Sequence, residues 1–242
     1  MLELYILIFL LSACAAFVQR VSGFGFGIFI MMFLPYIMPS YNEAVALSGI
    51  LSGCTALFIL LRNFRYVQWC KMWVVLSANA FVSFFVIQFM LSMNNALLRY
   101  FLGVVLIVVS LYFIFFDGRI KMLFVSWWSR VLVGGVSGVM GAMFGMPGPP
   151  VVLYGINVLR GKKEYLSTMQ AFWLLFNLVY LCFRSGGGYY TSYTLSYFCM
   201  GAAGVLFGLF GGARCFAMLN GKAFKMVVYL LMFASGVVAF FR

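Results

Sequence analysis

The sequence contains no histidine and only four acidic residues among its 242 residues. Without histidine, the usual zinc and haem sites are excluded, and a serine nucleophile has no imidazole base. The stretch Gly-Val-Ser-Gly at 135–138 is therefore a chance match to the serine motif of intramembrane proteases. We expect no enzymatic activity, no catalytic residue, no bound metal and no cofactor.

Paired cysteines and clustered positive charge are also missing. The six cysteines show neither a CxxC motif nor regular spacing, which favours their interpretation as small buried apolar residues. Sixteen Lys and Arg residues give a net charge of +12, but they are spread over short loops and form no basic face. A topology signal explains them better than nucleic-acid binding, because positive charge is retained on the cytoplasmic side of a membrane.

The chain has no polar stretch long enough for a separate soluble domain. Hydrophobic residues make up 66% of it and charged residues 8%, with a mean hydropathy of +1.10. So much apolar surface requires lipid as the main solvent. We expect an all-α integral membrane protein of ten apolar segments, over residues 4–19, 24–38, 43–61, 69–91, 96–116, 129–143, 149–159, 166–183, 193–212 and 223–241.

Two glycine-rich breaks interrupt this pattern about half the chain length apart. The first is Ser22-Gly23-Phe24-Gly25-Phe26-Gly27, and the second covers 141–150, including Gly145-Met146-Pro147-Gly148-Pro149-Pro150. Each is flanked by two segments that are short for a full crossing. Glycine releases the backbone from helical angles and proline preferentially begins a helix, so each pair is expected to form a helical hairpin.

The placement of positive charge tests the hairpins. If each broken pair returns to its own side, twelve of the sixteen Lys and Arg residues lie inside. Arg99, Arg184 and Arg242 then lie outside, and Arg20 lies at the tip of the first hairpin. Each half then holds five segments and enters the membrane from the opposite side. We predict two inverted repeats, 1–118 and 129–242, joined by a cytoplasmic interfacial linker at 119–128, with both termini outside the cell.

Paired broken helices are the best sequence pointer to a transporter's substrate site. Helix N-termini meeting near the membrane midplane would offer N–H groups and positive dipole ends to an anion. Arg20 would supply charge, unless it only closes a helix end, and Ser48, Gln170 and Asn177 would supply hydrogen bonds. The expected substrate-binding residues are Arg20, Ser22, Gly23, Gly25, Gly27, Ser48, Gly145, Pro147, Gly148, Gln170 and Asn177. Close helix packing through small residues is the alternative for the glycines, and the accepted interpretation for Gly204, Gly208 and Gly212, which could also support a homodimer.

The glycine run 23–27 with Pro35 and Pro39 downstream, together with 145–152 in the second half, resembles the TauE/SafE family, also called the toluene-sulfonate uptake permease family. The resemblance spans essentially the whole chain, although Phe26 interrupts a glycine cluster that is denser in the family. It implies a secondary transporter for a small sulfur-containing or organic anion, such as sulfite or a sulfonate, in the bacterial inner membrane. A non-transporting membrane scaffold or assembly factor and an anion channel are the alternatives.

Overall fold

The computed structural model describes residues 2–61, 63–90, 92–116, 126–185 and 189–215, together with Phe233 and Val237. Those residues form helices and their connections, with no strand among them. In chain order the elements are α1 (Leu2–Ser22), α2 (Phe26–Met31), α3 (Leu34–Ile37), α4 (Tyr41–Leu61), the 3₁₀ turn η1 (Phe64–Tyr66), α5 (Trp69–Met90), α6 (Asn95–Phe116), α7 (Trp127–Phe144), α8 (Gly148–Val158), α9 (Lys162–Arg184) and α10 (Ser192–Cys215). The all-helical prediction is confirmed for this part of the chain.

Five of these helices are long and apolar enough to cross a membrane, namely α1, α4, α5, α9 and α10. Large apolar side chains on their outer faces are exposed, as lipid-facing side chains would be; Phe81 and Phe207 are examples. Most predicted segments agree with a helix to within a few residues. The first was expected to be short, but α1 continues through Ser22 to a length of 21 residues. Apart from Phe233 and Val237, the tenth segment, 223–241, lies outside the described residues, as does most of the linker, 119–128.

The second predicted segment, 24–38, is two helices. Its backbone is interrupted between Met31 and Leu34, and Pro35 sits in the first turn of α3. Proline has no N–H to donate to the residue four positions earlier, so α2 cannot continue through this point. The prolines of α8, Pro149 and Pro150, fall in its first turn, where no such bond is required, and α8 runs on uninterrupted.

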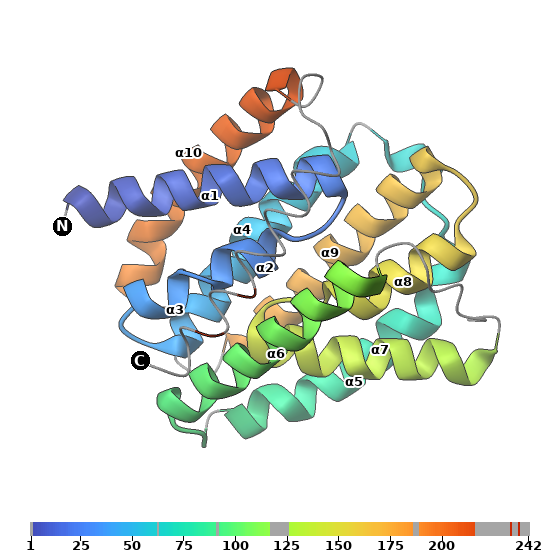
Figure 1. The fold of residues 1–242 in the computed structure, drawn as a ribbon, viewed down its shortest axis with the longest axis horizontal. Helices are drawn as coiled ribbons and strands as arrows, with labels where there is room; N and C mark the ends of the chain where they lie inside the picture. Colours follow the sequence, from blue (N-terminus) through green and yellow to red (C-terminus); the bar gives the residue numbers. More distant parts are fainter. Residues whose placement is uncertain are drawn as a thin grey trace.

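Helices α4 and α9 pack on each other at the centre of the molecule, with α1 and α10 packed together on one side and α5 and α7 on the other (Figure 1). Each glycine-rich connection turns the chain back, so that α2 packs along the end of α1 and α8 along the end of α7. In Figure 1, α1 runs from left to right and α7 from right to left. Helices α4 and α9 are likewise opposed in direction.

Glycines allow the two outer helix pairs to approach closely. On α10, a Cβ at Gly204 or Gly208 would collide with the carbonyl oxygens of Phe9 and Ala13 on α1. The close packing predicted for these two glycines is thus observed, and it occurs within one chain. A homodimer seam through them is not available in this arrangement, because α1 already covers them.

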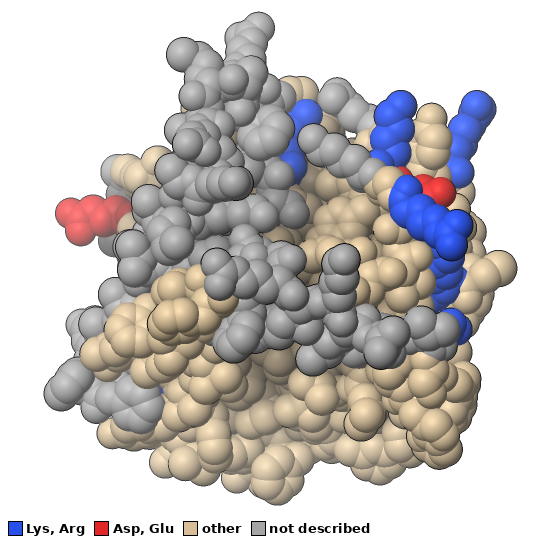
Figure 2. Space-filling view, turned by 45° about the vertical axis from the view of Figure 1, so that its right-hand side comes forward, with Lys and Arg blue, Asp and Glu red and all other residues tan. Residues whose placement is uncertain are grey.

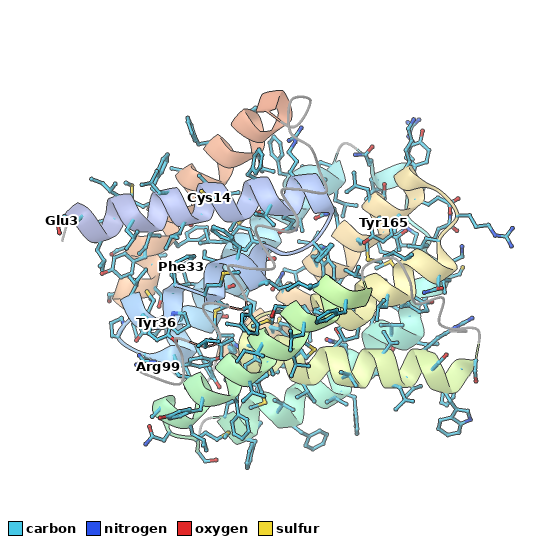
Figure 3. All side chains as sticks on the ribbon, in the orientation of Figure 1. Glu3, Cys14, Phe33, Tyr36, Arg99 and Tyr165 are labelled. Carbon is cyan, nitrogen blue, oxygen red and sulfur yellow. The ribbon has the colours of Figure 1, made fainter. Side chains whose placement is uncertain are left out.

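Positive side chains gather at one end of the face that Figure 2 shows, with little charge over the remaining visible surface. The loops between α4 and α5 and between α8 and α9 pack together through contacts from η1 to α9. A hydrogen bond from Lys71 Nζ to the Val158 carbonyl oxygen, 3.2 Å long, joins the second of these loops to α5. Arg99 lies at the opposite end, beside Tyr36 (Figure 3).

Candidate functional site

The two glycine-rich breaks touch each other in the interior. Gly27, in the first turn of α2, lies against the carbonyl of Gly145, so a Cβ on Gly27 would overlap that oxygen. Gly145 in turn is surrounded by Ser48 and Val45 of α4 and by Met31. Segments far apart in the sequence therefore meet at a contact made of backbone.

Glycine is required at these turns for its backbone angles as well as its size. Gly23 and Gly25 have φ values of 81° and 97°, and Gly145 has 66°, all in the left-handed region. Gly25 is the N-cap of α2 and makes no side-chain cap hydrogen bond. Because the first N–H groups of a helix have no partner within it, the start of α2 presents donors to the space in front of it.

The start of α8 offers fewer donors than the sequence pattern suggests. The N–H groups of Gly145 and Met146 already bond to the end of α7, at Gly141 and Met140. Pro147, Pro149 and Pro150 have no N–H at all. Within the first turn of α8, the N–H of Gly148 is the remaining donor that can face a ligand.

A cavity lies between the two breaks. In this arrangement its volume is about 20 Å³, room for roughly one water molecule, so a larger ligand would need the two breaks to move apart. Its walls are apolar rings, glycine backbone and uncharged polar groups, contributed by Gln19, Phe24, Gly25, Phe26, Gly27, Ile28, Ser52, Gly145, Met146, Pro147, Gly148, Trp173 and Asn177.

Two side chains of α9 bond the Gly23 carbonyl of the first break, and a third side chain orients one of them. Trp173 Nε1 donates to this oxygen over 2.8 Å and Gln170 Nε2 over 3.1 Å. Gln19 Nε2 donates to Gln170 Oε1 at 2.8 Å, which fixes the orientation of both amides. Gln19 Oε1 is buried with no hydrogen-bond partner. Helix α9 thereby fixes the first break from across the molecule.

Two hydroxyl groups bond the second break, and side chains of two further helices support one of them. Ser137 Oγ donates to the Pro147 carbonyl at 2.8 Å, and Tyr41 Oη donates to that of Met143 at 2.9 Å. Asn79 Nδ2 lies 3.4 Å from Ser137 Oγ and 3.0 Å from the Tyr180 hydroxyl. The network joins α5, α7 and α9 behind the cavity, so the position of Pro147 depends on all three.

Most of the predicted site residues come together here. Those that line the cavity are Gly25, Gly27, Gly145, Pro147, Gly148 and Asn177. Gly23 and Gln170 bond to each other at its edge, and Ser48 is buried beside Gly145 with an unpartnered hydroxyl. Arg20 is half-buried in the last turn of α1 and is not among the lining residues, and the side chain of Ser22 lies outside the described residues.

Several residues at or near the site were not predicted from the sequence: Gln19, Phe24, Phe26, Trp173 and Arg184. Trp173 shares a helical face with Gln170, three positions earlier, and this spacing was the available signal. Arg184 was expected at the outer surface but is 1% exposed, so it is a buried cation close to the site.

A family model described as "Sulfite exporter TauE/SafE" matches residues 8–239 of the chain. Neither the search of curated proteins nor that of solved structures found a match.

Proposed function

Because the chain belongs to the TauE/SafE sulfite exporter family, a family of membrane transporters, we propose that it is a secondary transporter for a small sulfur-containing or organic anion. The observation that carries this proposal is the meeting of the two helix breaks at one cavity in the interior. Backbone that leaves the helix inside a membrane protein is tolerated where it lines a cavity, and such breaks form the binding sites of transporters. The bacterial inner membrane is the expected location.

The proposed architecture is a pair of inverted repeats that rock about this cavity. In support, the main helix contacts occur in matching pairs: α1 with α10 matches α7 with α5, and α1 with α2 matches α7 with α8. The corresponding helices α1 and α7 run in opposite directions (Figure 1). Two oppositely oriented halves around a shared site are the usual basis of alternating access.

We propose an anion as the ligand because backbone N–H donors at helix starts adjoin the cavity. The first turn of α2 and the N–H of Gly148 present hydrogens and positive partial charge. No acidic side chain is among the lining residues. A sulfite or sulfonate would accept hydrogen bonds from these groups, while Phe24, Phe26 and Trp173 would contact an organic substituent.

Thermal stabilisation of the detergent-purified protein by a panel of anions tests this function. The panel contains sulfite, sulfate, isethionate, taurine, sulfoacetate, acetate and chloride, and each is measured on the wild type and on Arg20→Ala. We expect sulfite or the sulfonates to raise the melting temperature, since a ligand at 100 times its Kd adds about 2.7 kcal/mol of stability. Loss of the shift in Arg20→Ala would assign Arg20 to the ligand, and retention would assign it to closing α1.

Uptake into proteoliposomes then separates a transporter from the alternatives. A transporter gives saturable flux of the stabilising anion, and an anion channel gives flux that rises without saturation. A wild type that neither binds nor moves any anion of the panel would contradict the proposed function and favour a membrane scaffold, in which the glycine breaks serve packing alone.

A further inference from the structure

Arg184 is a buried cation whose partners carry no formal charge. It ends α9 and is 1% exposed. Its Nη2 donates to the Ala142 carbonyl oxygen at 2.7 Å and lies 3.5 Å from that of Gly141. The guanidinium carbon lies 5.4 Å from the centre of the Tyr180 ring and 5.8 Å from that of Tyr189. These partners are carbonyls and rings, and no described carboxylate is among them.

The tyrosine rings do not neutralise this charge. Burial raises the pKa of the Tyr189 phenol and outweighs the opposite influence of the neighbouring arginine, so the phenol stays protonated. Arginine itself remains charged in proteins. A buried cation without an anionic partner is costly, and inside a membrane protein it indicates a functional site. Its Nε is buried and makes no hydrogen bond, so the guanidinium keeps an unused donor.

The guanidinium lies next to the cavity, on the same face of α9 as a residue that lines it. A Cβ on Gly49 of α4 would lie 3.3 Å from Asn177 Oδ1 and 3.7 Å from Arg184 Nη1, which places these two atoms within about 7 Å of each other. Asn177 is part of the cavity wall. A side chain at Gly49 would therefore contact both the cavity wall and the cation.

We propose that Arg184 contacts the anion that this transporter binds. The anion carries at least two oxygens on one atom, as a sulfonate, sulfite or carboxylate does. The inference rests on the proposed function and adds the charged group that the cavity wall lacks. The planar guanidinium would bind two oxygens in parallel, a geometry that the point charge of lysine does not offer. In the present arrangement Ala142 and Gly141 take the place of the anion, because carbonyls at a helix C-terminus carry partial negative charge.

A purely structural Arg184 would only close the C-terminus of α7, a role that lysine also fills. Arg184→Lys therefore separates the two roles. If Arg184 contacts the anion, this variant should keep the ligand-free melting temperature within a few degrees but bind isethionate about tenfold more weakly, the size of one charge-assisted hydrogen bond. Arg130→Lys is the matched control on a half-buried arginine of α7 and should bind as the wild type does.

Gly49→Ala tests the same site without touching the arginine. Its methyl group would fill the space between Asn177 and Arg184 and leave the hydrogen bond to Ala142 in place. We expect weaker binding of isethionate and little change for the smaller sulfite. Gly135→Ala, whose Cβ meets only Val82 at 3.7 Å, is the control for adding a methyl group to a helix glycine.

The outcomes separate this inference from the function on which it rests. If the wild type binds isethionate and both Arg184→Lys and Gly49→Ala bind it equally well, the role of Arg184 is refuted and the transporter stands. If Arg184→Lys loses its fold, Gly49→Ala decides alone: weaker isethionate binding supports the inference, and unchanged binding overturns it. A wild type that binds no oxyanion refutes both.

Discussion

The surroundings of Gly27 leave no room for any side chain. The carbonyl of Gly145 occupies the position that a Cβ would take. Backbone atoms cannot rotate aside as a side chain can, so this contact excludes even alanine. The two helix breaks, from different halves of the chain, are thus in direct backbone contact.

Gly27→Ala should destabilise the protein by about 2 kcal/mol or more, because the methyl group must push two backbone segments apart. Helix propensity alone would give the opposite sign, since alanine is favoured over glycine by about 1 kcal/mol. Thermal unfolding in detergent measures the difference. Gly135→Ala, in ordinary contact with Val82, serves as the control and should be neutral or stabilising. Equal melting temperatures for the two variants would show that the breaks are not in contact.

The sequence predicted the glycines of the site better than its side chains. Gly25, Gly27, Gly145 and Gly148 stand out because glycine and proline have few other uses in an apolar segment. Trp173 does not stand out, because an indole in a membrane helix is as common at an interface as at a binding site. Its bond to the Gly23 carbonyl joins residues 150 positions apart, and no local pattern records such a contact.

At the scale of whole elements, the outer helix pairs depend on glycine in the same way. Gly204 and Gly208 lie one turn apart on α10 and receive the backbone of α1 at Phe9 and Ala13. Gly134 does the same on α7, where a Cβ would lie 2.5 Å from the Val75 carbonyl oxygen of α5. Small residues at this spacing allow helices to approach in lipid, where no hydrophobic force brings them together.

Gly208→Ala should therefore weaken the packing of α1 on α10 by about 1 to 3 kcal/mol. Gly211→Ala provides a control in the same helix, because nothing lies within 4 Å of its Cβ position. The melting temperature should fall for the first variant and stay constant for the second. Size-exclusion chromatography with light scattering should give the same mass for both, since Gly208 faces α1 of its own chain. A change of oligomeric state in Gly208→Ala alone would contradict the intrachain role.

The broken element of the first half shows where sequence patterns stop being informative. Hydropathy runs without interruption from Phe24 to Met38, so a single segment was expected. Pro35 was visible, but a proline can begin a helix, kink it or end it, and only the packing decides. Here α3 begins one residue before Pro35, after Phe33 N–H has bonded to the Ile30 carbonyl oxygen at 3.1 Å.

At the scale of the whole molecule, the positive charges are distributed unevenly between the two ends at which the helices begin and end. The visible Lys and Arg side chains gather at one end in Figure 2, and Arg99 lies at the other end in Figure 3. Because loops rich in Lys and Arg are retained in the cytoplasm, the protein would be oriented with the α8–α9 loop inside the cell. This orientation is a prediction from the sequence alone, because loop charge can be assigned without knowledge of tertiary contacts.

Cysteine accessibility tests that orientation in cells. In a variant without its native cysteines, Asn94→Cys, in the loop before α6, should react with a membrane-impermeant maleimide added outside. Lys163→Cys, at the start of α9, should react only after the membrane is permeabilised. Both positions are exposed, so burial does not limit the reaction. Reaction of both residues from outside would refute the predicted inverted topology.

The described walls of the cavity consist of amides, a hydroxyl, an indole, aromatic rings, a thioether, aliphatic side chains and glycine backbone. None of these groups gains or loses a proton in neutral solution. Any variation of affinity with acidity must then originate in the anion. A sulfonate, which is fully ionised, would bind with a flat profile from mildly acid to mildly alkaline buffer. The profile for sulfite would follow the titration curve of sulfite itself: affinity that falls as pH rises would show that the singly charged form enters, and affinity that rises would show the doubly charged form.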